Sequence, residues 1–280
     1  MKSLEDSTVP TETKRRGRKP KKMAQKELLN MFYEETGVLE PKETIYNKKT
    51  IECYKYLSPA EKQKFEKGFT VPKNANQEKY VTFLNEKTRK IIVVSGPAGT
   101  GKTLFATEYG VRHFLMGAYE KLIFTRPSVS VDEDIGYLPG TLEEKMAPWV
   151  RPIYDILYQF ISPKDVKQYM EDKTIEIAPL GYMRGRTFKN AWIVADEMQN
   201  STVSQMKMLM TRLGENSRMV ITGDLEQYDR QNEVNGLDDF LRKFNDKTSS
   251  SIVSLPFKKN DIQREEVVKE VLDIYSGQVV

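Results

Sequence analysis

A glycine-rich loop constrains the fold of this chain more than any other feature. The segment Gly96–Thr103 reads GPAGTGKT, which fits the pattern Gly-x4-Gly-Lys-Thr. Glycines let the backbone curl so that its N–H groups surround phosphate oxygens, while the lysine reaches the β- and γ-phosphates and the threonine hydroxyl binds Mg²⁺. The motif requires a preceding strand and a following helix, and Ile91–Val94 and Thr103–Met116 have those patterns. We therefore predict a nucleoside triphosphate site formed by Gly96, Pro97, Ala98, Gly99, Thr100, Gly101, Lys102 and Thr103.

Strand-like runs alternate with helix-like runs over residues 70–280. Five further short apolar runs are expected to be strands: Leu122–Thr125, Thr174–Ile177, Ala191–Ala195, Met219–Thr222 and Ile252–Leu255. Helices are expected at about Ser204–Leu213 and Asp261–Tyr275. This alternation favours a parallel sheet with helices on both faces, so we predict one α/β domain at 70–280.

The N-terminal part differs in composition. Residues 1–24 are polar and lack apolar periodicity, which predicts a disordered basic tail. Residues 25–69 are expected to be a small helical accessory segment, with a helix start signalled by Ser58-Pro59-Ala60-Glu61. Residues 1–30 hold nine Lys or Arg against four acids, whereas the whole chain has a net charge of +4. The remainder is therefore close to neutral, and its net charge does not indicate a uniformly basic nucleic-acid-binding surface.

The composition also bears on the compartment. Cys53 is the only cysteine, which excludes an internal disulfide and fits a reducing environment. No apolar run approaches the length of a membrane span, and the N-terminus lacks a secretory apolar region. We expect a soluble protein of the cytoplasm, in a bacterium or a phage-infected host cell, with no membrane partner.

Two acids follow one of the buried runs. Asp196 and Glu197 come directly after Ala191–Ala195, and the carboxyl end of a parallel strand lies beside the phosphate crevice. We predict that Asp196 binds Mg²⁺ and that Glu197 orients and deprotonates the attacking water.

Polar residues also follow the next strand. Gln199 and Asn200 lie past the acids, and Gly223-Asp224-x-x-Gln227 follows Met219–Thr222. A glutamine beside the γ-phosphate can sense it and position water without adding charge, so we assign that role to Gln227. Asp224 is a further candidate for ordering the metal.

These motifs together resemble those of the PhoH-like ATPases, relatives of the superfamily 1 helicase motor core. The resemblance covers about 70–280 and is carried by GPAGTGKT, TRPSV (125–129), LPGTLEEKMAPW (138–149), IEIAPLGYMRGRTF (175–188), DEMQN and ITGDLEQ. It implies ATP hydrolysis on one RecA-like domain and a role on RNA. It assigns Gly96–Thr103 to phosphate, Asp196 and Glu197 to metal and water, and Gln227 to the γ-phosphate. It also suggests that Gln77 reads adenine.

The sequence departs from the family pattern in two places. The stretch 131–136 is more acidic than usual, and Asp261-Ile262-Gln263-Arg264 keeps the family's arginine without the histidine that follows it. Both departures affect substrate contacts and leave the phosphate chemistry intact.

Phosphoryl transfer needs a positive charge at the γ-phosphate, and helicases supply it from a second motor domain. Too few residues follow 252–255 for such a domain, so we expect a homo-oligomeric ring in which a neighbour donates an arginine. The candidates are Arg184, Arg186, Arg212 and, as the favoured one, Arg264. The alternative is that each arginine simply pairs with surface acids.

Single-stranded nucleic acid, RNA above all, is the expected partner. Arg126, Arg184 and Arg186 are candidates for contacts with its backbone. Arg15, Arg16 and Arg18 lie in a tail that resembles an AT-hook, which binds the narrow minor groove of AT-rich duplex. The alternative is a basic tail with non-specific affinity.

Two other function classes remain open: a nucleotide-switched DNA-binding protein that uses this tail, and a small-molecule P-loop kinase. His113 is expected to pack or to be solvated rather than to serve catalysis or bind a metal, and Trp149 and Trp192 are expected to pack.

Overall fold

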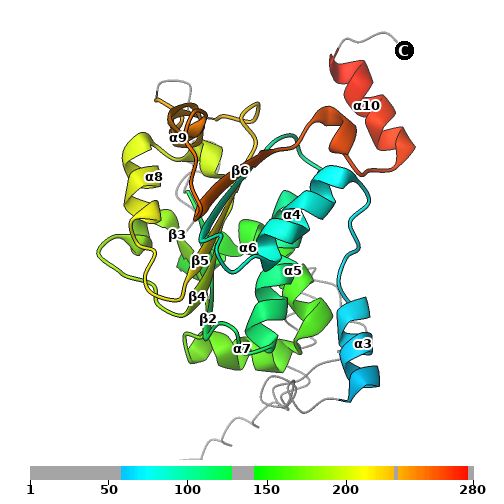
Figure 1. The fold of residues 1–280 in the computed structure, drawn as a ribbon, viewed down its shortest axis with the longest axis vertical. Helices are drawn as coiled ribbons and strands as arrows, with labels where there is room; N and C mark the ends of the chain where they lie inside the picture. The colour runs from blue at the N-terminus through cyan, green and yellow to red at the C-terminus, as the bar shows by residue number, and fades with distance from the viewer. Residues whose placement is uncertain (1–57, 128–141, 230–232, 277–280) are drawn as a thin grey trace, which may run out of the picture. The chain divides into compact units, whose positions relative to one another are not determined.

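A parallel sheet of six strands lies at the centre of residues 58–127, 142–229 and 233–276, which the computed structural model describes. Its order is β3-β2-β4-β5-β1-β6, and every paired neighbour is parallel (Figure 1). The strands are β1 (Ile91–Ser95), β2 (Lys121–Arg126), β3 (Ile175–Pro179), β4 (Ala191–Ala195), β5 (Arg218–Gly223) and β6 (Ile252–Pro256). All six predicted strands are confirmed, with bounds shifted by a residue or two at most.

Helices cover both faces of this sheet. One face carries α4 (Ala75–Asn85), α5 (Lys102–Leu115), α6 (Leu142–Phe160) and α7 (Pro163–Glu171). The other carries α8 (Val203–Met210) and α9 (Gly236–Phe244) (Figure 1). The predicted two-sided α/β architecture is therefore confirmed. Helices α4, α6, α7 and α9 had no counterpart in the sequence prediction, and α6 contains Pro148 and Pro152, which normally argue against a continuous helix.

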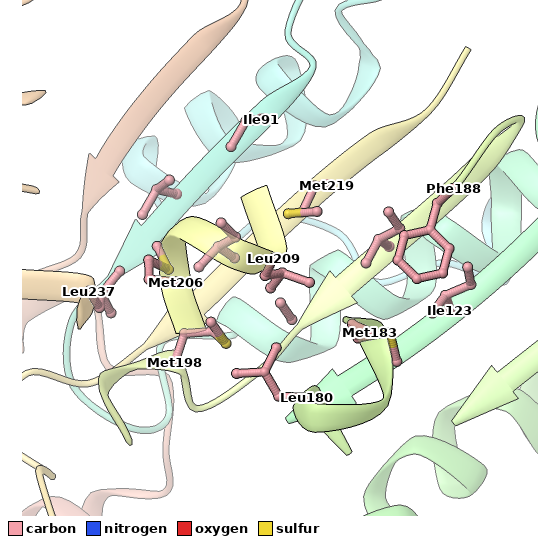
Figure 2. Close-up of a cluster of buried hydrophobic side chains, with 14 of the residues drawn as sticks. Ile91, Ile123, Leu180, Met183, Phe188, Met198, Met206, Leu209, Met219 and Leu237 are labelled. Carbon is pink, nitrogen blue, oxygen red and sulfur yellow. The ribbon is translucent and has the colours of Figure 1, made fainter. Parts of the chain in front are cut away.

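The sheet is buried because its strands are apolar on both faces. Strands β1, β4 and β5 are buried along their whole lengths. On the α8 side the core is rich in methionine, with Met198, Met206 and Met219 packed around Leu209 (Figure 2). Flexible thioethers fill irregular gaps well, so this face accommodates two short helices and a 3₁₀ turn.

The end of the predicted accessory segment packs onto the same domain. Helix α3 (Pro59–Lys67) begins where the Ser58-Pro59 signal predicts a start. Phe65 is fully buried, and the Phe69 ring stacks on Phe160 with centroids 4.5 Å apart. The rest of that segment and the predicted tail, residues 1–57, lie outside the described residues.

Two predicted helix bounds are wrong. Helix α10 (Glu266–Ser276) starts five residues later than expected, because the Gln263 N–H donates to the Gly99 carbonyl at 2.9 Å and holds the chain against the phosphate loop. A short 3₁₀ turn, η5 (Lys259–Asp261), ends just before this contact. Helix α8 ends at Met210 rather than Leu213, because the next residues pair with Phe188 instead.

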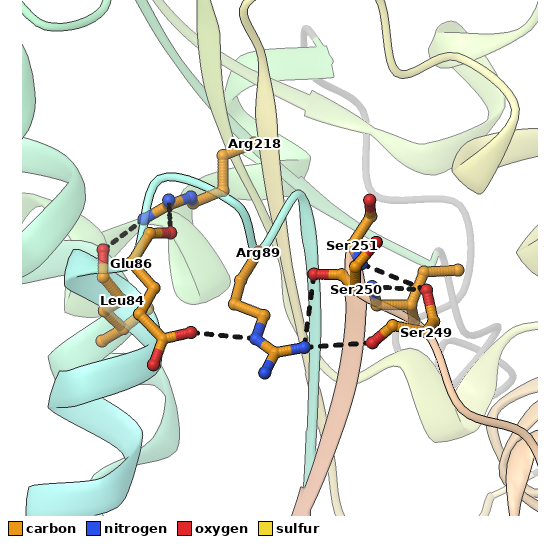
Figure 3. Close-up of polar contacts among 8 residues, drawn as sticks. Leu84, Glu86, Arg89, Arg218, Ser249, Ser250 and Ser251 are labelled. Carbon is orange, nitrogen blue, oxygen red and sulfur yellow. Dashed lines mark hydrogen bonds and ion pairs between the residues drawn. The ribbon is translucent and has the colours of Figure 1, made fainter.

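A buried arginine ties α4 to the sheet. Arg218 at the start of β5 is 2% exposed, and its guanidinium donates to the carbonyls of Leu84 and Glu86 at the end of α4 (Figure 3). Arg89 extends this link from Glu86 to the carbonyl of Ser249, which precedes β6 (Figure 3). Cations stabilise the carbonyl end of a helix, so these two arginines fix where α4 ends.

Within the described residues, no helix combines the length and the apolar character that crossing a bilayer requires.

His113 is half-buried and packs against the core, which is one of the two expected alternatives. Its ring stacks on Trp192 with centroids 5.2 Å apart, and Trp192 is fully buried. Burial, together with the nearby cations Arg218 and Arg112, lowers the pKa of His113 to about 4.

This pKa predicts a pH dependence of stability. In the unfolded chain the His113 imidazole is protonated below about pH 6.5, whereas in the folded chain it is protonated only below about pH 4. As the pH is lowered from about 6.5 to about 4, the free energy of unfolding should therefore decrease, by up to about 1.4 kcal/mol per pH unit. Urea unfolding at pH 5, 6 and 7 measures the slope. His113→Phe keeps an aromatic ring against Trp192 and should flatten it; equal slopes would contradict the assignment.

Candidate active site

The phosphate loop connects β1 to α5 through glycines in conformations that other residues rarely adopt. Gly96 has φ +139°, and a Cβ there would lie 2.5 Å from the Phe257 carbonyl oxygen. Gly101 begins α5 with φ +86°, in the left-handed region. The strand–loop–helix context that the motif requires is present.

Lys102 lies within the curl of this loop. Its Nζ donates to the carbonyls of Gly96 at 2.6 Å and Pro97 at 2.8 Å. Burial lowers the pKa of Lys102, while the negative charges of Asp224, Asp196 and Glu197 oppose that shift. The ammonium group therefore stands where a bound phosphate would meet it.

Asp196 follows β4 and joins the loop to the neighbouring strand. Its Oδ1 accepts hydrogen bonds from the Thr103 hydroxyl at 2.7 Å and from the Thr222 hydroxyl of β5. Thr103 and Asp196 thus form an adjacent pair of hard oxygen ligands. No cluster of three or more His, Cys, Asp or Glu that could hold a metal occurs among the described residues. Mg²⁺ suits such a partial ligand set, because it is usually bound by one or two protein oxygens together with substrate phosphates and water.

Glu197 is held by a residue whose role the sequence did not reveal. Its backbone is left-handed, with φ +53°, which is uncommon for a non-glycine residue and occurs often at functional sites. Gln199 Nε2 donates to Glu197 Oε2 at 2.5 Å and to the Gln227 carbonyl at 3.1 Å. Gln199 Oε1 accepts from the Asp224 N–H at 3.0 Å. One buried amide therefore joins the acid after β4 to the turn after β5.

Gln77 lies beneath the phosphate loop, in the first turn of α4. Its side chain is 3% exposed; Nε2 donates to the Thr100 carbonyl at 3.1 Å, and Oε1 accepts from the Lys73 N–H at 2.8 Å. These bonds hold the loop, while the predicted contact with adenine stays a prediction. Residues 70–73 form the adjoining wall, where buried Glu108 of α5 accepts from the N–H and hydroxyl of Thr70 at 2.8 and 2.7 Å.

The segment before α10 closes the other side of the loop. Asp261 accepts hydrogen bonds from Asn76 Nδ2 and the Lys258 N–H, both at 2.8 Å. Arg264 then passes so close that a Cβ on Gly99 would meet its Nε at 2.5 Å. Arg264 is therefore in its own chain's cleft, whereas the sequence-based hypothesis had it delivered by a neighbour.

These elements enclose a cleft of about 470 Å³. Its walls combine the phosphate loop, the acids, the turn after β5, residues 70–73 and the segment before α10. The lining residues are Thr70, Val71, Lys73, Gln77, Ala98, Gly99, Gly101, Lys102, Thr103, Leu104, Phe105, Asp196, Glu197, Gly223, Asp224, Gln227, Gln263 and Arg264. Glu108, Gln199, Thr222 and Asp261 support this cleft, although the sequence analysis gave none of them a supporting role.

The other predicted arginines have different surroundings. Arg126 ends β2 and is half-buried, and Arg184 is exposed. Arg186 is paired with Glu176 through its two terminal guanidinium nitrogens, and Nη2 lies 2.7 Å from Glu176 Oε2. The pKa of Arg186 is raised chiefly by this contact. Arg212 donates to the Met208 carbonyl at 3.2 Å. Arg186 is therefore already paired within the chain, and its contact with nucleic acid stays a prediction.

Several predictions fall on residues that the structure does not describe. Arg15, Arg16 and Arg18 lie there, as does the acidic stretch 131–136. The side chain of Trp149 is likewise outside the description.

Comparison with known proteins places these features in a family. A sequence profile described as "PhoH-like protein" matches residues 70–276. The PhoH-like protein of Mycobacterium bovis is 40% identical over 215 residues, covering 75% of this chain and 59% of that protein. The PhoH-like protein of Bacillus subtilis is 38% identical, covering 82% and 72%. Protein PhoH of Escherichia coli is 37% identical, covering 74% and 59%. The chain thus spans about three fifths of the mycobacterial and E. coli relatives.

Solved structures show only distant likeness. Bacteroides Pif1 bound to single-stranded DNA matches 75% of this chain and 47% of its own, with a TM-score of 0.33 and 18% identity. The UvsW helicase of bacteriophage T4 matches 83% and 77%, with a TM-score of 0.36 and 12% identity. Scores this low carry no argument. The family match and the sheet order, with β5 between β1 and β4, support the RecA-like P-loop fold.

The bonds of Gln77 predict a general effect on nucleotide binding. Gln77→Ala removes the bond that holds the loop at Thr100 and the bond that holds the adjoining wall at Lys73, which should weaken ATP and GTP alike by about 5- to 30-fold. Titrations with fluorescent ATP and GTP analogues measure both affinities. Glu78→Gln, an exposed neighbour on the same helix, is the matched control and should leave both unchanged. A loss confined to ATP would instead show that Gln77 reads the base.

Proposed function

The chain belongs to the PhoH-like protein family, and on this premise we propose that it hydrolyses ATP with Mg²⁺ and couples hydrolysis to binding or remodelling of single-stranded nucleic acid, RNA foremost. One observation supports hydrolysis above all others. The phosphate-loop hydroxyl of Thr103 lies 2.7 Å from Asp196, and the next residue, Glu197, lines the same cleft. Two residues suited to bind Mg²⁺, Thr103 and Asp196, and the proposed general base Glu197 therefore lie at one cleft.

The loop and Lys102 bind and orient the triphosphate. Glycines at positive φ let the loop curl around phosphate oxygens, and α5 adds the positive end of its dipole at Gly101. Lys102 exchanges its two loop carbonyls for β- and γ-phosphate oxygens. Thr103 and Asp196 would hold Mg²⁺, which neutralises charge on the β- and γ-phosphates when bound.

Glu197 prepares the attacking water. Its carboxylate takes a proton from that water as the new bond to the γ-phosphorus forms and the bond to the bridging oxygen breaks, which releases ADP and phosphate. Gln199 fixes Glu197 Oε2 by its 2.5 Å bond. Gln227 faces the same cleft and would contact the γ-phosphate, while Arg264 adds the positive charge that phosphoryl transfer requires.

The position of Arg264 bears on whether an oligomer is needed to supply an arginine to the γ-phosphate. Because this arginine already lines its own cleft, a ring is not required to complete the charge at the γ-phosphate. Homo-oligomerisation remains a prediction, and Arg184 and Arg264 are the exposed residues among its four candidate arginines. A small-molecule kinase is less favoured, because Glu197 beside Asp196 suits water activation.

Two substitutions test hydrolysis. Lys102→Ala and Glu197→Gln should each lower ATP turnover by at least about 100-fold, since one removes a phosphate ligand and the other the general base. Glu197→Gln should still bind ATP with nearly normal affinity, whereas Lys102→Ala should bind it weakly. Phosphate release and equilibrium binding measure the two properties separately. Glu226→Gln, an exposed acid in the turn after β5, is the control. Full turnover in Glu197→Gln would rule out the assigned base.

A candidate nucleic-acid surface lies at the carboxyl edge of β2 and β3. Arg126 ends β2 in register with Pro179 of β3, and η3 (Leu180–Met183) follows at once. Tyr182 on this turn is 60% exposed, and the exposed Arg184 comes two residues later. An exposed aromatic ring beside cations fits single-stranded nucleic acid, whose bases stack and whose phosphates need positive charge. Tyr182 joins Arg126 and Arg184 as a contact that the sequence prediction missed.

RNA should therefore stimulate ATP turnover through Tyr182. Tyr182→Ala removes the stacking surface and should weaken RNA affinity by about 5- to 100-fold, whereas Tyr182→Phe keeps the ring and should bind normally. Filter binding and ATPase assays with single-stranded RNA and single-stranded DNA, at stated salt, measure both effects. Turnover that neither nucleic acid changes would contradict the coupling, while leaving hydrolysis itself standing.

A further inference from the structure

A second, much smaller cavity adjoins the carboxylate of Asp196. It has a volume of about 10 Å³, close to the least room that one water molecule needs. Its polar walls come from Thr103, Thr125, Arg126 and Asp196, and the remainder includes Phe124 and Val194. The cavity is thus lined by both polar and apolar residues.

Two groups on its wall lack hydrogen bonds. Thr125 is 1% exposed, and its hydroxyl has no partner among the residues that the structure describes. Asp196 Oδ1 accepts from two hydroxyls, but across the same described ranges no bond is formed by Asp196 Oδ2. The two residues are fixed side by side, because the Asp196 N–H donates to the Thr125 carbonyl at 2.9 Å. A buried donor and a carboxylate acceptor therefore border one water-sized space.

We propose that this cavity binds a single ordered water molecule, which accepts a hydrogen bond from the Thr125 hydroxyl and donates one to Asp196 Oδ2. Buried hydroxyls are costly without a partner, and buried waters occur where two to four polar groups converge. Arg126 is a third polar neighbour. Thr125 is then a positioning residue, which acts on the metal carboxylate through the water.

The bridge has a consequence for Mg²⁺, and this part rests on the proposed function. With Oδ2 fixed by the water and Oδ1 by Thr103 and Thr222, the carboxylate cannot rotate. Outer contacts of this kind hold metal ligands in place, and their loss weakens metal binding by about tenfold or more. The water itself requires neither nucleotide nor metal.

Thermal unfolding of the full chain without nucleotide and Mg²⁺ tests the water. Thr125→Val keeps the shape and removes the hydroxyl; if a water bridges there, its loss should lower Tm by about 2–4 °C. Thr107→Val is a matched control, because the Thr107 hydroxyl is also buried and unpartnered among the described residues but does not line the cavity. Its replacement should leave Tm unchanged or raise it. If Thr125→Val behaves in the same way, the proposal is overturned.

Magnesium titrations of ATP-analogue binding test the consequence. The Mg²⁺ concentration for half-maximal binding should rise about tenfold in Thr125→Val and stay within about twofold in Thr125→Ser, which keeps the hydroxyl. Coincident curves for wild type and Thr125→Val would refute the positioning role. Absence of nucleotide binding by wild type would instead refute the proposed function, and the Tm comparison would still decide the water. A high-resolution crystal structure with a dry cavity, or with Thr125 bonded directly to Asp196, would overturn the proposal.

Discussion

The carboxylate of Asp196 is the contact on which the rest of the site depends. Asp196 follows β4, and its carboxylate accepts hydrogen bonds from the hydroxyl of Thr103, at the start of α5, and from the hydroxyl of Thr222, on β5. The phosphate-loop helix, the acid-bearing strand and the strand between β1 and β4 are thereby joined at one oxygen atom. Because parallel strands all end at the same edge, this one contact sets the loop, the acids and the turn of Asp224 around a common space.

Segments far apart in the chain complete that space. Gln77 supports the loop from α4, and Asp261 links α4 to the stretch that places Arg264 against Gly99. At the amino ends of the strands, Arg218 fixes the end of α4, and Arg89 fixes the segment that precedes β6. The same helix is thus held at both ends, so the position of Gln77 depends on contacts made one helix length away.

The local structure around the phosphate loop and the acids could be predicted closely. GPAGTGKT and the acids after Ala191–Ala195 are local patterns, and all six strands were indicated by short β-branched or apolar runs. The supporting residues could not be predicted in the same way. Glu108 lies in no motif, and the motif positions of Gln199 and Asp261 did not reveal their partners. Burial and specific hydrogen bonds give these residues their supporting roles. The pairing of Arg186 with Glu176, ten residues earlier, likewise follows from the fold and is marked by no motif.

The sequence by itself determined the architecture and the phosphate-loop motif on which the proposed ligand class rests, because phosphate binding needs a fixed backbone pattern and buried parallel strands need continuous apolar runs. Tertiary structure decided which polar side chains serve the site. The start of α10 illustrates the difference: residues 262–265 lack helical structure because Gln263 bonds to Gly99, more than 160 positions earlier. Contacts across such distances depend on how the chain folds back on itself, and no local spacing encodes them.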